Sequence, residues 1–536
     1  MAERREGGMA GGREPKLIAL IGLLLASWSC EAGPYQRQAP DAPVIRIGAP
    51  TRLTGLDPTF SWDYYKALPV TYVFEGLSRA GDGGAIEPAL AREWQVSPDS
   101  RTWRFTLRAG VRFHDGTPFR AADVIRSWTT ALRVEEGELA HPWMLDPIEG
   151  AVVFSAGRGN GAVPGLEAPD DTTLIVRLRE PLAFFPTLLS LPQSFITAPA
   201  SDSANPIGTG PWRWVGGSGD EVRLVRNDAY WSRAPLLDSL LYRYVPDSLV
   251  ARAFSEGWVD MASELPAALR QEWSVRSDIG FVESEALNAT RLIINFREPV
   301  FHDVRVRRAL NHAIAAARLA TTTGAASAVR AAGAIPPSLP GSSPDRAPYA
   351  FDPPRARSLL REGGYPFERP FRLRVPAPGL SDYPGEIGAL LRDYLEAVGL
   401  TVELTVQNEG IEAAMAEREA DAILSIWVGD YPDGDAFLYP LYHSRSAGNA
   451  GNEGFYANPA LDRLIDASRR EPDPARRMAL LKAADQLVFD DAPVVFLWFT
   501  RTTTAYSLRL EGWARDPQTS RFLELRLAGA VERANP

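Results

Sequence analysis

The stretch AILSIWV, residues 422–428, is followed directly by GDYPDGD, residues 429–435. The first stretch is short and almost entirely apolar, which predicts a buried strand. The second stretch contains two glycines and a proline, so it cannot continue that strand. Asp430 is therefore expected just beyond a strand end, which is where α/β sheets place their ligands.

Asp430 has two interpretations at this stage. It directly follows Gly429 and lies between two aromatic residues, Trp427 and Tyr431. A carboxylate beside aromatic rings suits an amine, because the charge pairs with the ammonium and the rings exclude water. The alternative is a turn aspartate that bonds to its own backbone. The local sequence leaves both interpretations open.

Length and charge limit the classes of protein to which the chain can belong. At 536 residues it is too long for one ordinary core, so two or three lobes are expected. Its 57 Lys and Arg residues against 67 Asp and Glu residues give a net charge of −10. This balance argues against a nucleic-acid partner, because such proteins normally carry a basic stripe.

The first 30 residues have the layout of a secretory signal. Basic residues lie within 1–16, an apolar run covers 17–26, and the single cysteine, Cys30, follows. The apolar run is too short to span a bilayer. A lone cysteine here resembles the bacterial lipoprotein signal, so Cys30 is the expected lipid attachment site, with Met1 or Met9 as the start. The alternative is a simple secreted protein.

The rest of the chain alternates strand and helix patterns. Residues 103–113 alternate apolar and polar side chains, which predicts a strand pair closed by a turn at Asp115 and Gly116. An amphipathic helix pattern follows at 121–134. Four residues of the second half each precede a helix pattern as candidate caps: Asp303, Asp352, Asn458 and Asp473. Repeated alternation of helix and strand predicts α/β lobes with mixed sheets.

The sequence contains no pattern for catalysis or metal binding. Among the five histidines, His114 and His302 each stand between a Phe and an Asp, but in different local contexts, so structural roles are expected. The chain lacks His-Glu-x-x-His, a cysteine pair, an EF-hand loop and Gly-x-Ser-x-Gly. The paired acids Asp490 and Asp491 are explained by solvation at a helix end. We therefore expect no cofactor, no metal and no enzyme activity, which leaves binding as the leading class.

Ten segments, taken together, carry a resemblance to a known family. They run in the family's order from about residue 45 to about residue 505: 73–77, 87–94, 104–119, 122–124, 208–212, 226–231, 295–296, 303–310, 430–433 and 492–495. The chain resembles the family 5 solute-binding proteins of ABC importers, the peptide, oligopeptide and nickel class. Much of this signature, including His114, serves folding in that family.

The resemblance implies a periplasmic binding protein-like α/β fold of class II, cluster C. Two α/β lobes are joined by two hinge crossovers, expected near 287–295 and 500–505, with an extra subdomain in the first lobe. The implied parts are a lipoprotein-type signal peptide at 1–30, a tether at 31–43, a first lobe at 44–290 plus 500–536 with its subdomain at about 70–195, and a second lobe at 291–499.

The resemblance also implies a site and a function. In peptide-binding members, the carboxylate at the position of Asp430 holds the α-ammonium of the ligand, and residues at the positions of Trp427 and Tyr431 line the cleft beside Gly429. The chain is then expected to bind di- to oligopeptides and to deliver them to an ABC permease and ATPase complex.

Two alternative functions remain open on the sequence. One is a binding protein of the same family for a sugar, an opine or a metal chelate. The other is a peptide sensor that presents its ligand to a receptor. The resemblance further implies a monomer in the cell envelope, periplasmic or extracytoplasmic and lipid-anchored to a membrane.

Overall fold

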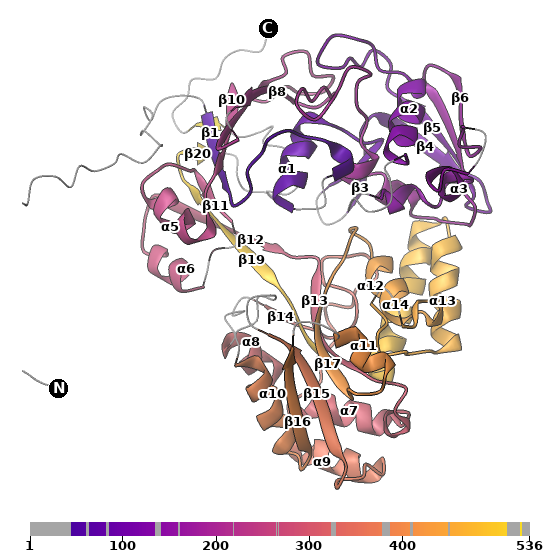
Figure 1. Ribbon diagram of the computed structural model, residues 1–536, viewed down its shortest axis with the longest axis vertical. Helices are drawn as coiled ribbons and strands as arrows, with labels where there is room; N and C mark the ends of the chain where they lie inside the picture. The colour runs from indigo at the N-terminus through magenta and orange to yellow at the C-terminus, as the bar shows by residue number, and fades with distance from the viewer. Residues whose placement is uncertain are drawn as a thin grey trace, which may run out of the picture. The chain divides into compact units, whose positions relative to one another are not determined.

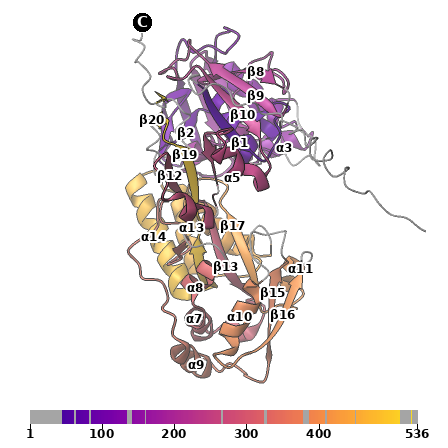
Figure 2. The same cartoon turned by 90° about the vertical axis from the view of Figure 1, so that its left-hand side faces the viewer.

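The computed structural model describes residues 44–60, 64–81, 85–133, 141–158, 161–217, 219–263, 265, 267–322, 328–377, 386–407, 411–448, 451–511 and 526–527. The expected signal peptide, tether and Cys30 lie outside this set. Two large sheets, of seven and six strands, and a separate four-stranded sheet organise the described chain (Figure 1; Figure 2). Mixed sheets covered by helices agree with the expected α/β class.

The first large sheet is built from both ends of the chain. Its strands and packed helices are β1 (Val44–Ala49), β8 (Trp212–Gly217), β9 (Glu221–Arg226), β10 (Ser239–Tyr244), β11 (Met261–Ala262), β12 (Ile279–Glu285), β19 (Arg501–Ser507), α1 (Tyr64–Val73), α5 (Asp247–Ser255) and α6 (Ala267–Trp273). The strand order is β12-β19-β11-β1-β10-β9-β8, and β1 pairs in parallel with β10 and β11. Ile45 and Ile47 of β1 share one hydrophobic core with Val73, the last residue of α1, and with Phe74, which follows it.

A subdomain is inserted between α1 and β8, and we call these two parts together the first lobe. The elements of the subdomain are β2 (Ser78–Ala80), β3 (Ile86–Pro88), β4 (Ala91–Val96), β5 (Thr102–Leu107), β6 (Leu166–Asp170), β7 (Thr173–Arg177), α2 (Ala121–Ala131), α3 (Ala151–Ser155) and α4 (Phe185–Leu188). Trp103, Phe105 and Leu107 alternate inward from β5, as the sequence predicted. Trp128 of α2 covers the same core.

One prediction within the subdomain is wrong. β5 pairs with β4 and β7, not with residues 111–113. The turn at Gly116 exists, but it joins a short bridge between Arg112 and Pro118. β5 ends at Leu107, and the chain then turns at Gly110, whose φ of 79° is a left-handed conformation.

The second large sheet and its helices form the second lobe. These are β13 (Asn288–Ile294), β14 (Val329–Arg330), β15 (Pro370–Pro376), β16 (Thr401–Gln407), β17 (Ala422–Val428), β18 (Val494–Phe499), α7 (Val304–Ala313), α8 (Ala316–Thr322), α9 (Pro353–Glu362), α10 (Ile387–Glu396), α11 (Ile411–Ala416), α12 (Asp435–Tyr442), α13 (Pro459–Arg470) and α14 (Pro474–Asp491). The strand order is β14-β18-β13-β17-β15-β16. The four predicted caps are confirmed, because each side chain accepts a backbone hydrogen bond at the start of its helix: Asp303, Asp352, Asn458 and Asp473.

The chain passes between the two large sheets twice, at the start of each expected crossover range. One passage is Ala286–Leu287, between β12 and β13, and the other is Thr500, between β18 and β19. The Ala286 amide donates to the Thr500 carbonyl at 2.9 Å, and the Thr500 amide donates to Oδ1 of Asn288 at 3.0 Å. The two crossovers are therefore bonded to each other. Figure 1 shows β12 and β19 leading from one large sheet to the other.

Asp491 corrects a further prediction. Its carboxylate accepts hydrogen bonds from Nη2 of Arg307 and from the hydroxyl of Tyr456, each at 2.6 Å. Solvation at a helix end therefore does not explain this residue. Its partner Arg307 stands far earlier in the chain, so the pairing has no local sequence signal.

The signature segments meet at a buried carboxylate, Glu75. Its oxygens accept hydrogen bonds of 2.8 Å from Thr209, Tyr230 and Trp231, which come from two other signature segments. Because Glu75 has no exposed surface, these bonds compensate for the loss of water. This part of the signature serves folding, as the resemblance implied.

His114 lies in the same region in its neutral form. Its Nε2 donates to the Gly210 carbonyl at 2.9 Å, and its Nδ1 accepts from the Gly208 amide at 3.4 Å. Desolvation lowers the pKa of His114 to about 4. A proton on Nδ1 would face the Gly208 amide, so the neutral ring suits both partners.

Replacing His114 with Gln should reduce the loss of folding stability that the wild type shows as the pH is lowered. The unfolded imidazole binds its proton near pH 6.5, and the folded one only near pH 4, so stability falls as the pH drops through this window. The loss approaches about 3 kcal/mol in the wild type. Urea unfolding at pH 7, 5.5 and 4.5 measures it, with the exposed His302→Gln variant as control. Equal pH slopes in the wild type and His114→Gln would contradict this role.

Candidate functional site

The 429–435 loop begins where β17 ends, as the sequence predicted. Gly429 is buried, and its amide donates to the Leu287 carbonyl of the first crossover at 2.6 Å. A Cβ on Gly429 would lie 2.5 Å from a ring carbon of Phe437. Glycine is therefore required at this position by close packing, and it places the loop directly against the hinge.

Asp430 is the carboxylate of this loop that has no partner among the described residues. Its side chain is exposed, and no hydrogen bond or ion pair to it occurs among the residues that the structure describes. The surrounding protein still desolvates the group enough to raise its pKa above the ordinary value of 3.8. Solvent reaches this carboxylate, yet the protein leaves its charge uncompensated.

Trp427 lies three residues before Asp430 and is partly buried. Its indole Nε1 donates to the Ala436 carbonyl at 2.8 Å, which bonds the end of β17 to the beginning of α12. A Cβ on Gly451 would lie 2.8 Å from this indole ring. The polar atom of Trp427 therefore serves the loop, and a ligand contact made by its ring remains a prediction.

Tyr431 points away from solvent, with only 8% of its surface exposed. Its hydroxyl donates to Oδ2 of Asp435 at 2.9 Å. Its ring stacks on Phe184 at 5.7 Å and 13°, and Trp143 lies at 5.7 Å in a tilted arrangement. Tyr431 follows Asp430 in the chain, but its side chain makes its contacts with Asp435, Phe184 and Trp143. A ligand role for Tyr431 stays a prediction.

Two buried ion pairs hold the loop in place. Arg477 of α14 donates to both oxygens of Asp433, at 2.7 and 2.8 Å. Arg469 of α13 donates to Oδ2 of Asp435 at 2.5 Å. Sequence reasoning missed both arginines, because they stand 44 and 34 residues after their partners. A pairing of this kind has no periodic signal in the sequence.

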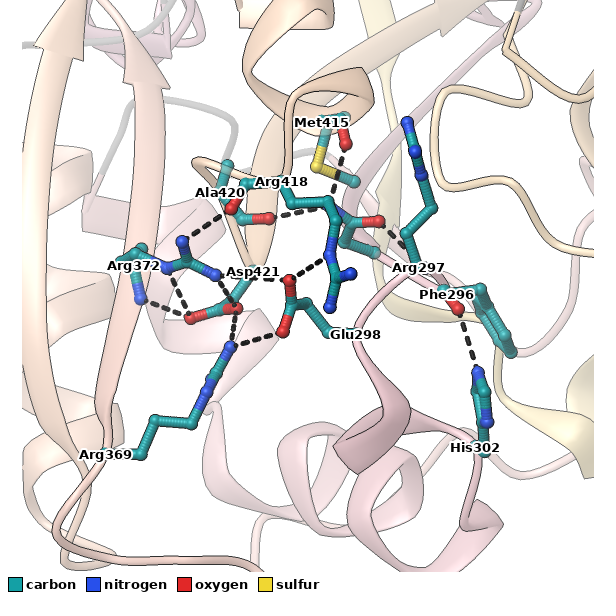
Figure 3. Close-up of polar contacts among 11 residues, drawn as sticks. Phe296, Arg297, Glu298, His302, Arg369, Arg372, Met415, Arg418, Ala420 and Asp421 are labelled. Atoms are coloured by element: carbon teal, nitrogen blue, oxygen red, sulfur yellow. Dashed lines mark hydrogen bonds and ion pairs between the residues drawn. The ribbon is translucent and has the colours of Figure 1, made fainter.

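The opposite end of β17 is fixed by a second charged cluster, drawn in Figure 3. Asp421 directly precedes the strand and is fully buried. Its carboxylate accepts hydrogen bonds from Arg369 at 2.6 Å and from Nη2 of Arg372 at 2.9 Å. Glu298 completes the cluster by accepting from Arg369 and Arg418, each at 2.9 Å. These groups are paired with each other, so the cluster anchors the strand.

The described residues contain no group of three or more His, Cys, Asp or Glu side chains placed to hold a metal ion. In this part of the chain, no helix is both long enough and apolar enough to cross a membrane. His302 donates from Nε2 to the Phe296 carbonyl at 2.9 Å, and His114 bonds to backbone as described, so both have structural contacts.

The family described as bacterial extracellular solute-binding proteins, family 5, matches residues 85–449. This span is well over half of the chain, and the chain belongs to this family. Its members are solute-binding proteins of ABC importers and not enzymes. The protein is accordingly an extracytoplasmic solute-binding protein, a class that binds a solute and works with a permease and an ATPase.

Characterised relatives cover almost the whole chain. The glutathione-binding protein GsiB of Pectobacterium atrosepticum is 27% identical over 493 residues, which cover 89% of this chain and 92% of that protein. GsiB of Escherichia coli (strain K12) is 26% identical over 495 residues with the same coverage.

Solved structures show the same fold. An unliganded open form of MppA, a periplasmic murein tripeptide-binding protein, has a TM-score of 0.80 at 23% identity and covers 91% of this chain and 98% of that one. DppA of Helicobacter pylori, in complex with the peptide STSA, has a TM-score of 0.69 at 24% identity, covering 90% and 98%. The expected periplasmic binding protein-like fold with two lobes is confirmed.

Replacing Asp430 with Asn should not lower the stability of the ligand-free protein. A folded-state pKa raised by desolvation means that the ionised carboxylate is disfavoured on folding. This penalty is absent below the ordinary pKa of an aspartate and fully present above the raised pKa of folded Asp430. At pH 7 the variant should therefore melt at the same temperature as the wild type or at a higher one. Thermal unfolding by circular dichroism measures it. A clear fall in melting temperature would mean that Asp430 has a structural partner.

Proposed function

We propose that this protein binds short peptides by their amino terminus and delivers them to an ABC permease. The observation that carries the proposal is Asp430, an exposed carboxylate with a raised pKa and no partner in the described chain. An isolated and partly desolvated carboxylate is unfavourable alone, and a cation from the ligand compensates for it. The α-ammonium of a peptide supplies that cation.

The position of the 429–435 loop supports a ligand role. Gly429 bonds to Leu287, so the loop lies directly beside the crossover that joins the lobes. Hinge closure around a ligand is the established behaviour of periplasmic binding proteins as a class. A ligand held at Asp430 would therefore contact the region about which the lobes move. Backbone hydrogen bonds to an extended peptide would add affinity without strict sequence preference.

The relatives support a small peptide as the ligand. GsiB is named for glutathione, a tripeptide with a free α-ammonium group. Binding of a sugar, an opine or a metal chelate is the competing outcome within the family, and the test below separates it. Presentation of a bound peptide to a receptor is the other alternative, and it would use the same ligand contact.

Asp430→Asn should weaken the binding of free peptides, measured by calorimetry with glutathione and a library of di- to tetrapeptides. Truncating one partner of a buried charged pair typically costs about 2–5 kcal/mol. Acetylating the peptide amino terminus should cost the wild type a comparable amount and the variant much less, since both changes delete one interaction.

Asp228→Asn is the matched control for this experiment. Asp228 is an exposed aspartate of the first lobe that pairs with Arg226, and its replacement should leave peptide binding unchanged. Equal binding of free and acetylated peptides by the wild type would remove the role of Asp430. Binding of sugars or metal chelates with no response to peptides would establish the competing solute class.

We also propose that Cys30, which lies outside the described residues, carries the lipid that anchors the protein. One acyl chain binds a membrane only marginally, whereas two or more anchor stably. Cys30→Ser should therefore move the protein from the membrane fraction to the soluble fraction, or leave it uncleaved, in cell fractionation. Free release of the wild type would show that the cysteine is not an anchor.

A further inference from the structure

Two neighbouring phenylalanines of the subdomain pack against different parts of the molecule. Phe185 is fully buried within its own subdomain, with ring centroids 6.3 Å from Trp103 and 6.5 Å from Phe105. Phe184 instead stacks on Tyr431 of the second lobe, at 5.7 Å and 13°. Phe185 anchors this turn in the subdomain core, and Phe184 projects from it to the other lobe.

The arginines that hold the 429–435 loop also flank Phe184. The guanidinium carbon of Arg477 lies 4.7 Å from the centre of the Phe184 ring, and that of Arg469 lies 5.5 Å from it. These distances are within the range of cation–π attraction. Phe184 is only 5% exposed, so its ring is almost completely buried among residues of the subdomain and of the second lobe.

Backbone bonds accompany this ring contact. The Ala183 amide donates to the Arg469 carbonyl at 2.7 Å, and the Ser100 hydroxyl donates to the Arg470 carbonyl at 2.9 Å. We call these interactions, together with the Phe184 ring, the Phe184 contact. None of its residues belongs to a crossover, so the contact is a connection between the lobes that is separate from the hinge.

We propose that Phe184 is a positioning residue for ligand binding, acting through Tyr431 on the adjacent Asp430. This inference rests on the proposed function, in which Asp430 binds the ligand. Tyr431 is held on one side by Phe184 and at its hydroxyl by Asp435, and its backbone is continuous with Asp430. The Phe184 contact thus fixes the loop and keeps the subdomain close to it before any ligand arrives.

Loss of the Phe184 contact should weaken ligand binding, because it lowers the fraction of molecules whose lobes are close together. A ligand that must touch both lobes binds the arrangement in which they are close together, and apparent affinity scales with the fraction of molecules already in it. The Phe184 contact favours that arrangement in the ligand-free protein. Removing the ring should therefore lower this fraction and weaken binding, although Phe184 itself does not touch the ligand.

The test compares Phe184→Ala with Phe154→Ala. Phe154 is also a subdomain phenylalanine, packed under Arg133 at 5.3 Å, but it is not part of the Phe184 contact. Three quantities are measured in each protein: hydrogen exchange of the segment containing Ala183 without ligand, the radius of gyration without ligand, and the dissociation constant for glutathione and the peptide library.

Phe184→Ala should show faster exchange at Ala183, a larger radius of gyration, and peptide binding weaker by about three- to tenfold, the range expected for one aromatic pair. Phe154→Ala should lower the melting temperature yet leave all three quantities at wild-type values. Phe184→Leu, which keeps apolar volume and loses the flat ring, should lie between wild type and Phe184→Ala, and it replaces that variant if Phe184→Ala does not fold.

Unchanged exchange and unchanged or tighter peptide binding in the Phe184 variants would overturn the proposal and leave Phe184 as a packing residue. A wild type that binds none of the peptides would instead contradict the proposed function. The two failures are distinguishable, because exchange and radius of gyration are measured without ligand and depend only on the contact between the lobes.

Discussion

The geometry of the site depends on the ion pairs Asp433–Arg477 and Asp435–Arg469. Between the end of β17 and Asp435, the first residue of α12, the chain is rich in glycine and proline and forms neither strand nor helix, so side-chain pairs supply the restraint here. Buried ion pairs add little net stability, because desolvation offsets the attraction, but they specify geometry when each charge has one partner. Arg477 pairs with Asp433 and Arg469 pairs with Asp435, so neither arginine neutralises Asp430.

β17 is held very differently at its two ends. At its beginning, Asp421 is bonded by Arg369 and Arg372 in a cluster where the charges compensate one another. At its end, the chain turns into a loop that presents Asp430 to solvent. The charges at the start of the strand are paired, and the charge of Asp430 beyond its end is not. Because the strand is held rigidly, the loop cannot move Asp430 to a partner within the protein, which suits a binding site.

The sequence predicted local features of this fold well and distant ones poorly. β17 spans residues 422–428, as expected, because an apolar run followed by glycine is a complete local signal. The caps at Asp303 and Asn458 were equally local. The partner strands of β5 were not predictable from alternation, since many strands offer the same pattern. The Arg307–Asp491 pair, separated by 184 residues, has no local signal at all.

For the candidate site, the sequence indicated the position of Asp430 but not its surroundings. Trp427 and Tyr431 were expected beside a ligand because they are neighbours in the chain. Their polar atoms bond to Ala436 and Asp435, because a buried indole or hydroxyl group must find a partner wherever the fold supplies one, and a ligand contact by either ring stays a prediction. Which side a ring faces is decided by tertiary packing, and no sequence spacing encodes it.

The strand order of the first sheet has a consequence for how this chain is made. β19, near the end of the described chain, lies between β12 and β11, so it is an interior strand of a sheet whose other strands are synthesised much earlier. The first lobe cannot close its backbone hydrogen bonds until residue 507 has emerged. Until then the earlier strands have an open gap, and long-range pairing of this kind forms slowly. A polypeptide that must pass through a membrane pore before folding gains time from this order of assembly.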